Sequence, residues 1–401
     1  MKKSIVLAAF AAALMCPSAQ AQQQTVKIGV LTDMSSLYAD NTGIGSVVAA
    51  KMAAEEFMKS HPNFKVEVVS GDHQNKADLG VQIANQWIDV DHVDVIADVP
   101  NSGVALAITQ VAAQKNKVFM ASGPASSDLT GPKCNSNMVH WTYDTWMLAN
   151  GTGKAIVKTG GDTWFFLTSD YAFGHALERD TAAVVEANGG KVLGKVRHPI
   201  NTNDFSSFLL QAQTSKAKII GLANAGGDTI NSIKQAGEFG IVTGGQKLAG
   251  LLVFISDVNS LGLKLAQGLN LTEAFYWDQN DATRAFSKRF AGKFGGKMPT
   301  SIQAGFYSAT KRYLEAIKEA GTDDADKVMA ALKAEPFDDP IFGKSTIRAD
   351  GRNVHDMYLY EVKKPEDSKG PWDYYKFIRK IPGDEAFRPM DQGECPLVKK
   401  G

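Results

Sequence analysis

The sequence predicts an α/β protein made of two Rossmann-like lobes, each built on a parallel β-sheet. Short β-rich runs alternate with helical stretches from residue 26, and the same alternation starts again after Asp144. Alternation of this kind is typical of parallel sheets with right-handed crossovers. The chain has 401 residues, 44% of them hydrophobic and 21% charged, which is an ordinary globular composition and a length that favours two cores.

The first lobe begins with a strand at residues 26–31, an apolar and β-branched run. A helix is expected at 46–59, where apolar residues recur at the spacing of one helix face. These residues are Val47, Ala50, Ala54, Phe57 and Met58. A strand at 65–70, a helix at 78–90 and a strand at 93–97 follow, which completes two β-α-β units.

The second lobe is predicted to repeat this order after residue 144. Its expected elements are a helix at 148–159, a strand at 163–168, a helix at 174–188, a strand at 191–196, a helix at 205–214, a strand at 217–222 and a helix at 228–239. Because a helix follows each strand, the strands of this lobe are expected to lie parallel as well.

Long connections replace tight turns at three places, which predicts three crossings between the lobes. They lie near residues 140–144, 275–278 and 347–351. The first lobe would comprise residues 22–143 plus 277–347, and the second residues 144–276 plus 348–401 with the C-terminal tail. Parallel sheets bind ligands beyond the carboxyl ends of their strands, so we expect the binding site in the cleft between the lobes.

Residues 1–21 have the pattern of a secretory signal peptide. Two lysines at 2–3 precede an apolar run at 5–15, and small residues surround a cleavage site after Ala21. The mature protein is therefore expected in the periplasm. The apolar run is shorter than the roughly 20 residues that span a bilayer, and no later run reaches that length, so no membrane insertion is expected.

The charge balance excludes two classes of partner. The 43 Lys and Arg residues equal the 43 Asp and Glu residues in number, so no overall field attracts nucleic acid or an anionic membrane. Cys134 and Cys395 remain after the signal is removed, and a pair of cysteines in an oxidising compartment predicts a disulfide. Such a bond would contribute at most roughly 5 kcal/mol. The alternative is two unpaired buried thiols.

Several segments, in this order, carry a family resemblance. They are residues 26–31 leading through Tyr38 to Gly45, then 98–105, 119–122 with 129–130, and 170–174. The chain resembles the periplasmic solute-binding proteins of the leucine/isoleucine/valine-binding family over nearly its whole mature length. The aromatic run 275–278 and the tail after Gly370 are most similar to the branch for aromatic acids or branched-chain amino acids.

The resemblance implies a type I periplasmic binding fold whose two lobes close over a small solute. It also implies delivery of that solute to the membrane permease subunits of an ABC importer, with no cofactor. A ligand sensor that docks on a membrane receptor would use the same closure. We expect a monomer, because one closing cleft works without a partner subunit.

Two loops of the first lobe are candidates for binding a carboxylate. Residues 98–103 and 121–127 each follow a strand, and the first precedes a helix whose N-terminus favours an anion. In the family, the matching loops bind the carboxylate of the solute. The candidate residues are Asn101, Ser102, Gly103, Ser122, Ser126 and Ser127. The alternative is that both are ordinary capped loops.

Aromatic residues and one further loop are candidates from the rest of the cleft. Tyr171 and Phe173 follow a strand, and Phe173 lies where the family commonly places an aromatic ring on the ligand. The loop 224–228 is a second contact loop in the family. The further candidates are Tyr38, Asn224, Gly226, Asp228 and Trp277. Each aromatic side chain could instead belong to the core.

The class of solute depends on whether an acidic side chain reaches the cleft. An ammonium group could not be buried without one, and Asp228 and Asp257 are the candidates. If neither reaches the cleft, an aromatic acid or aryl keto acid fits better than a branched-chain amino acid. We favour the aromatic acid, with the branched-chain or another hydrophobic amino acid as the alternative.

Enzymatic activity is disfavoured. Gly43 and Gly45 superficially resemble a dinucleotide fingerprint, but the third glycine is replaced by Val48. The sequence contains no Gly-x-Ser-x-Gly elbow, no His-Glu-x-x-His and no phosphate-binding Gly-Lys-Ser/Thr loop. Its seven histidines lack the spacing of metal ligands, so no metal site is predicted.

Overall fold

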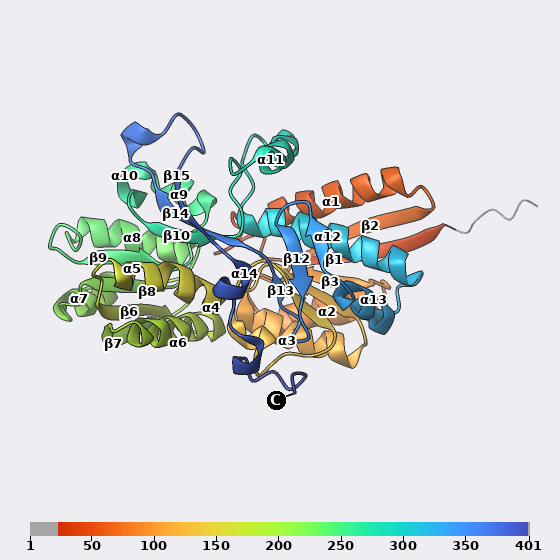
Figure 1. Cartoon of the computed structure of the whole chain (residues 1–401), viewed down its shortest axis with the longest axis horizontal. Helices are drawn as coiled ribbons and strands as arrows, with labels where there is room; N and C mark the ends of the chain where they lie inside the picture. The colour runs from red at the N-terminus through yellow and green to blue at the C-terminus, as the bar shows by residue number, and fades with distance from the viewer. Residues whose placement is uncertain (1–22, 400–401) are drawn as a thin grey trace, which may run out of the picture.

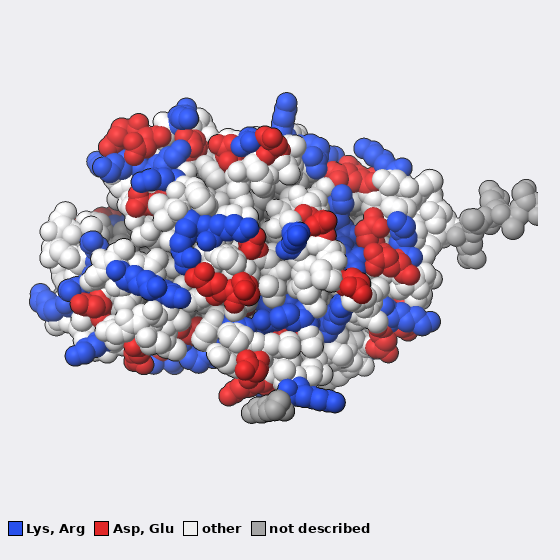
Figure 2. All heavy atoms as spheres, in the orientation of Figure 1, with Lys and Arg blue, Asp and Glu red and all other residues white. Residues whose placement is uncertain are grey.

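Two lobes lie side by side along the long axis of the molecule, each built around a parallel sheet (Figure 1). The computed structural model describes residues 23–399, so the predicted signal peptide at 1–21 lies outside the described residues. Within that range no helix is long and apolar enough to span a bilayer. Basic and acidic side chains are interspersed over the face seen in Figure 2, in keeping with the balanced charge of the chain.

The sheet of the first lobe has the order β2-β1-β3-β4-β5, and all neighbouring strands are parallel. Its strands are β1 (Gln24–Thr32), β2 (Phe64–Asp72), β3 (Val95–Asp98), β4 (Val118–Ala121) and β5 (Met138–His140). Helices α1 (Gly43–Ser60), α2 (Ala77–Asp89) and α3 (Ser102–Gln114) connect the first four strands. Strands β3 and β4 are wholly buried, as expected for a parallel sheet covered on both faces.

The first lobe is completed by segments from the second half of the chain. Helix α12 (Ser301–Ala320) packs against α1, and α13 (Ala325–Lys333) packs against α12. Helix α11 (Asp281–Lys293) also contacts α1. A small antiparallel sheet follows, made of β11 (Phe337–Asp339), β12 (Gly343–Ile347) and β13 (Asn353–Val354).

The second lobe has a parallel sheet of order β7-β6-β8-β9. Its strands are β6 (Thr163–Ser169), β7 (Lys191–His198), β8 (Ile219–Ala223) and β9 (Lys247–Gly250). Its helices are α6 (Ala172–Ala187), α7 (Ser206–Thr214), α8 (Gly227–Glu238), α9 (Ile255–Leu261) and α10 (Leu263–Ala266). The two series of β-α-β units predicted from the sequence, one from residue 26 and one after residue 144, are thus confirmed.

The predicted helix at 148–159 is not one regular helix. It begins earlier, as α4 (Thr145–Leu148), widens into a π-helical turn at Ala149–Gly153, and ends as α5 (Lys154–Lys158). A Cβ atom on Gly151 would lie 2.3 Å from the hydroxyl oxygen of Thr272, so only glycine allows this close approach. The widened turn also lets Thr152 contact the Thr272 hydroxyl at 2.8 Å. Tertiary packing therefore overrides the helical periodicity here.

An antiparallel sheet of order β10-β14-β15 accompanies the second lobe. Its strands are β10 (Asn270–Glu273), β14 (Met357–Val362) and β15 (Tyr375–Ile381). Stacked tyrosines at 276 and 375 cover it, with ring centroids 4.8 Å apart. The tail then continues through the short helix α14 (Gly383–Ala386).

The chain passes between the lobes three times. By the order of the elements, the crossings are residues 141–144, 274–280 and 355–356. Before the third crossing, Gly351 adopts a φ of 84° in the turn between β12 and β13, which pair antiparallel. The buried Arg352, in the turn before β13, bonds the first crossing, since its Nη1 donates to the Tyr143 carbonyl at 2.9 Å and lies 3.3 Å from Asp144 Oδ2.

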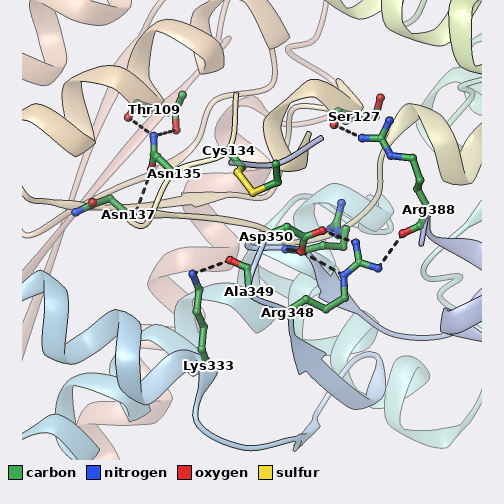
Figure 3. The surroundings of a disulfide bond; sticks show 12 residues. Thr109, Ser127, Cys134, Asn135, Asn137, Lys333, Arg348, Ala349, Asp350 and Arg388 are labelled. Atoms are coloured by element: carbon green, nitrogen blue, oxygen red, sulfur yellow. Dashed lines mark hydrogen bonds and ion pairs between the residues drawn. A yellow bond between two sulfur atoms is a disulfide. The ribbon is translucent and has the colours of Figure 1, made fainter. Parts of the chain in front are cut away.

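The predicted disulfide between Cys134 and Cys395 is confirmed (Figure 3). The two Cα atoms are 5.6 Å apart although 261 residues separate them in sequence. The bond fixes the C-terminal tail to the first lobe. Arg388 strengthens this attachment, because its Nη2 donates to the Ser127 carbonyl at 3.2 Å and its own carbonyl accepts from Arg348 at 2.9 Å.

Candidate functional site

A cavity lies between the lobes, beyond the carboxyl ends of strands from both parallel sheets. Its free volume is about 20 Å³, room for about one water molecule. The first lobe and first crossing contribute Tyr38, Asn41, Thr42, Pro100, Gly123, Ala125, Tyr143 and Ile302, and the second lobe contributes Tyr171, Phe173, Ala225, Leu252 and Phe254. The walls are therefore rich in aromatic rings, and none of these described lining residues is Asp, Glu, Lys, Arg or His.

The loop after β1 positions Tyr38, Asn41 and Thr42. The buried carboxylate of Asp33 accepts a hydrogen bond from the Tyr38 amide at 2.9 Å. The Tyr38 carbonyl in turn accepts from the amides of Asn41 and Thr42, both at 3.0 Å. The loop is thus a compact turn that ends at the start of α1 and presents these side chains to the cavity.

A strained turn after β3 positions Pro100. Asp98 and Val99 have φ values of 75° and 57°, in the left-handed region that a β-branched residue rarely adopts. Burial of the Val99 side chain and a hydrogen bond of 2.9 Å from its amide to the Leu31 carbonyl hold the turn. Strain of this kind gathers at binding sites, where the surrounding structure must enforce it.

Buried tyrosine hydroxyls dominate the polar chemistry of the cavity. The hydroxyls of Tyr38 and Tyr171 contact each other across the lobes, and that of Tyr143 donates to the Gly123 carbonyl at 2.7 Å. Burial raises the pKa of each of these three tyrosines well above its usual value. All three hydroxyls are therefore protonated at neutral pH and can donate hydrogen bonds.

Further contacts join the lobes beside the cavity. Asn41 Nδ2 donates to Asp257 Oδ2 at 3.3 Å, and the Gly227 amide donates to the Leu37 carbonyl at 3.4 Å. A Cβ atom on Gly226 would lie 2.4 Å from that same carbonyl, so glycine permits the approach. The structure is thus closed around the cavity.

Several helices begin at the cavity wall. Helices α1, α6 and α8 start beside lining residues, and none of their N-cap residues, Thr42, Tyr171 and Gly226, makes a side-chain capping bond. Their first N–H groups have no intrahelical partners, and their dipoles point positive ends at this region. Uncapped N-termini that converge in this way favour a negatively charged group in the cavity.

Buried carboxyl groups lie just behind the lining. Burial raises the pKa of Asp98, Asp228 and Asp257 to about 7 each and that of Glu273 to about 8. Among the described residues, no group of three or more His, Cys, Asp and Glu side chains could hold a metal ion.

Of the predicted site residues, Tyr38, Tyr171 and Phe173 line the cavity. The two predicted first-lobe loops also reach it, but through Pro100, Gly123 and Ala125. Their polar side chains bond to other protein groups. Asn101 Oδ1 accepts from the amides of Gly103 and Val104 and caps α3, and Ser102 Oγ accepts from the amides of Ala125 and Ser126. Ser126 caps the next short helix, Ser127 donates to Asp180 at 2.6 Å, and the buried Ser122 hydroxyl has no hydrogen-bond partner among the described residues.

The remaining predicted residues of the second lobe lie behind or away from the lining. Asn224 is buried and accepts from the Thr229 hydroxyl at 2.7 Å, while its neighbour Ala225 lines the cavity. Asp228 accepts from two backbone amides, and Asp257 caps α9 by accepting from the Phe254 amide at 2.8 Å. Trp277 packs with the tail, where its indole donates to the Trp372 carbonyl at 2.7 Å.

The sequence prediction missed several lining residues, among them Asn41, Thr42, Tyr143 and Phe254. Tyr143 lies within the predicted first crossing, and a crossing between two lobes necessarily passes the cleft between them. Phe254 is the N-cap residue of α9, only three positions before the predicted Asp257. The positions of Tyr143 and Phe254 could therefore have indicated from the sequence that both lie near the cleft.

Comparison with known proteins gives a consistent result. Residues 25–370 match the family model described as periplasmic binding protein. A periplasmic binding protein from Burkholderia mallei is 53% identical, with a TM-score of 0.91, over 94% of this chain and 100% of that one. A branched-chain amino acid ABC transporter periplasmic ligand-binding protein from Burkholderia xenovorans LB400 is 42% identical, with a TM-score of 0.82, over 93% and 99% of the two chains. The Leu/Ile/Val-binding protein homolog 6 of Brucella melitensis is 26% identical over 91% of this chain and 94% of its own length.

Proposed function

Because the chain belongs to the periplasmic binding protein family, we propose that it binds a small aromatic carboxylate between its lobes and delivers it to the permease subunits of an ABC importer. The family supplies binding components of ABC transporters, which are not enzymes, and implies a periplasmic location. Export through residues 1–21, with cleavage after Ala21, is part of the proposal.

The observation that carries the choice of solute is the character of the cavity wall. Five aromatic rings, of Tyr38, Tyr143, Tyr171, Phe173 and Phe254, line the cavity. Aromatic walls suit a planar apolar solute, which would enter when the lobes open. The N-termini of α1 and α6, which have no side-chain cap, supply N–H donors for a carboxylate.

The positions of the candidate acidic partners support a solute without an amine. Neither Asp228 nor Asp257 lines the cavity. Both carboxylates already accept backbone hydrogen bonds, Asp228 from Asn201 and Thr202 and Asp257 from Phe254. An ammonium group buried here would lack the direct acidic partner that it needs.

A branched-chain amino acid is the second candidate, favoured by the described role of the 42% identical Burkholderia xenovorans protein. Its side chain would also fit an apolar cavity. Its ammonium group would require Asp257 to turn away from α9 and Asn41.

We further propose that the two bodies that close over the solute meet at the predicted boundaries 143/144 and 276/277, and that the third boundary lies at residues 355–356 instead of the predicted 347/348. The contacts between Tyr38 and Tyr171 and between Asn41 and Asp257 would break on opening, which would admit the solute. We expect a monomer in solution.

A thermal-shift screen of the protein from Gln22 onward tests the proposed solute. The panel contains benzoate, 4-hydroxybenzoate, phenylpyruvate, leucine, isoleucine and valine. A solute at about 100 times its Kd stabilises the folded state by about 2.7 kcal/mol, which raises the Tm measurably. We expect aromatic acids to raise the Tm and the amino acids to leave it unchanged. A shift with leucine or valine, and none with the aromatic acids, would refute the proposed solute.

A further inference from the structure

Buried carboxyl groups surround the cavity, and no basic side chain balances them there. Asp98, Asp228, Asp257 and Glu273 are 0%, 1%, 1% and 4% exposed. Asp98 lies against Gly123, and Asp257 bonds Asn41 and Phe254, all of which line the cavity. Asp228 lies in the first turn of α8, just after the lining residue Ala225, and Glu273 bonds Ser301, the neighbour of the lining residue Ile302. No described lining residue is Lys, Arg or His. A buried negative charge without a cationic partner is costly, so the protonation of these four groups must respond to any charge that enters the cavity.

Asp98 lies behind the wall of the first lobe. Its Oδ1 is 2.7 Å from the position that a Cβ atom on Gly123 would take, and both Gly123 and Pro100 line the cavity. Neither carboxylate oxygen of Asp98 has a hydrogen-bond partner among the described residues. The polar and titratable side chains that face it are Thr32 on β1, Ser46 on α1 and Tyr143 in the first crossing.

Asp257 and Glu273 lie at the junction of the two lobes. Asp257 accepts from Asn41 of the first lobe, and Glu273 accepts from the hydroxyl of Ser301 on α12. The titratable groups that face this pair are Asp40, Tyr143, Tyr360 and Tyr375. A cation near them, Lys297, lies 3.7 Å from Asp40, and 56% of its side chain is exposed, so water screens its charge.

Asp228 lies behind the wall of the second lobe, in the first turn of α8. Its oxygens accept from the amides of Asn201 and Thr202 at 3.2 and 2.9 Å. The titratable groups that face it are the hydroxyls of Tyr38 and Tyr171, which line the cavity. These four acids thus face hydroxyls, amides and one another.

The closed cavity already favours the neutral form of these acids, because burial raises the pKa of three of them to about 7 and that of Glu273 to about 8. A carboxylate solute would add a negative charge in the same low-dielectric space and raise each pKa further. The solute-bound form would therefore hold more protons than the free form at neutral pH.

We propose that the protein takes up protons when it binds its anionic solute, so that its affinity for a carboxylate increases as the pH falls through neutrality. The inference rests on the proposed function, because the negative charge of the solute sets the direction. An ammonium solute would stabilise ionised carboxylates instead, release protons, and bind more tightly as the pH rises.

Isothermal titration calorimetry with benzoate tests the inference. Benzoate remains ionised well above its pKa, which is near that of other carboxyl groups. Each proton taken up changes the affinity about tenfold per pH unit. We expect the Kd to fall at least about tenfold between about pH 8 and about pH 6, and the binding enthalpy at about pH 7 to differ between phosphate and Tris buffers in the sense of proton uptake.

Asp98→Asn keeps the shape of the side chain and removes one titrating group. We expect it to bind benzoate more tightly than the wild type at about pH 8, equally at about pH 6, and with less proton uptake. Asp339→Asn is the matched control, because Asp339 is also buried with a raised pKa but bonds Ser308 and no lining residue. If Asp98→Asn fails to fold by circular dichroism, Glu273→Gln replaces it.

The outcomes separate the two proposals. A Kd for benzoate that does not change with pH, or that falls as the pH rises, would overturn the inference and leave the proposed function intact. The same pH slope in Asp98→Asn, Glu273→Gln and the wild type would also overturn it. Failure of every aromatic carboxylate in the screening panel to bind would overturn the proposed function, and the inference with it.

Discussion

The hydroxyl contact between Tyr38 and Tyr171 provides a test of how closure contributes to affinity. The two hydroxyls meet across the lobes at the cavity wall, and burial keeps both protonated. In the open form each would be hydrated. Replacing one tyrosine by phenylalanine therefore leaves the other hydroxyl buried without this partner only when the lobes close.

The expected change in Kd follows because the remaining hydroxyl is unpaired only in the closed form. Leaving one buried hydroxyl unpaired costs about 1–3 kcal/mol, whereas removing a hydrogen-bonded pair altogether costs about 0.5–1.5 kcal/mol. Tyr38→Phe and Tyr171→Phe should each raise the Kd of the solute about 5- to 150-fold. The double variant should be no weaker than either single variant, so the two effects should not add.

Calorimetric Kd values for the wild type, both single variants and the double variant complete the cycle. Tyr313→Phe is the control, because Tyr313 is 1% exposed, its hydroxyl has no hydrogen-bond partner among the described residues, and it does not line the cavity. It should leave the Kd unchanged. Additive losses from the two single variants would refute the view that these hydroxyls act as a pair on closure.

Three further variants have expected outcomes. Phe173→Ala removes a ring from the cavity wall and should weaken solute binding by more than about 1 kcal/mol in calorimetry, whereas an unchanged Kd with an intact fold would place Phe173 in the core alone. Arg352→Met leaves the buried Asp144 without its ion pair at 3.3 Å and should lower the free energy of unfolding in urea by about 3–5 kcal/mol; a loss below about 1 kcal/mol would contradict this role. Replacing Cys134 and Cys395 together by serine should lower the free energy of unfolding by at most about 5 kcal/mol and leave the Kd unchanged. The mature chain from Gln22 onward, denatured without reductant, should contain no free thiol.

The parallel sheets could be predicted because their signal is local. Apolar runs at 26–31, 163–168 and 217–222 are each followed by a helical pattern, and hydrophobic periodicity is sufficient to recognise such units. The helix at 148–159 was predicted with the wrong geometry, because the cause of its π-helical turn is a contact with Thr272, more than a hundred residues away. Sequence pattern does not reveal a partner at that distance.

The candidate site was predicted at the level of loops rather than side chains. Asn101 and Ser102 have the chemistry of carboxylate binders, but in the structure they bond to the amides of their own or adjacent loops. Composition shows which donors a loop offers and not which of them the fold uses. Tyr38 and Phe173, predicted with the help of the family resemblance, line the cavity in the structure.

The disulfide and the closing motion are compatible because of where the tail crosses the molecule. The Arg352 guanidinium, which bonds the first crossing, lies 4.7 Å from the centre of the Phe387 ring. Arg388 bonds Ser127 in the first lobe and lies over Trp146, just after the first crossing. The tail is therefore held beside the crossings, where rotation of the lobes displaces atoms least. A disulfide-bonded tail at this position lowers the conformational entropy of the unfolded chain and does not oppose the proposed closure of the lobes. Loss of the Cys134–Cys395 bond should therefore change the free energy of unfolding and leave solute affinity intact.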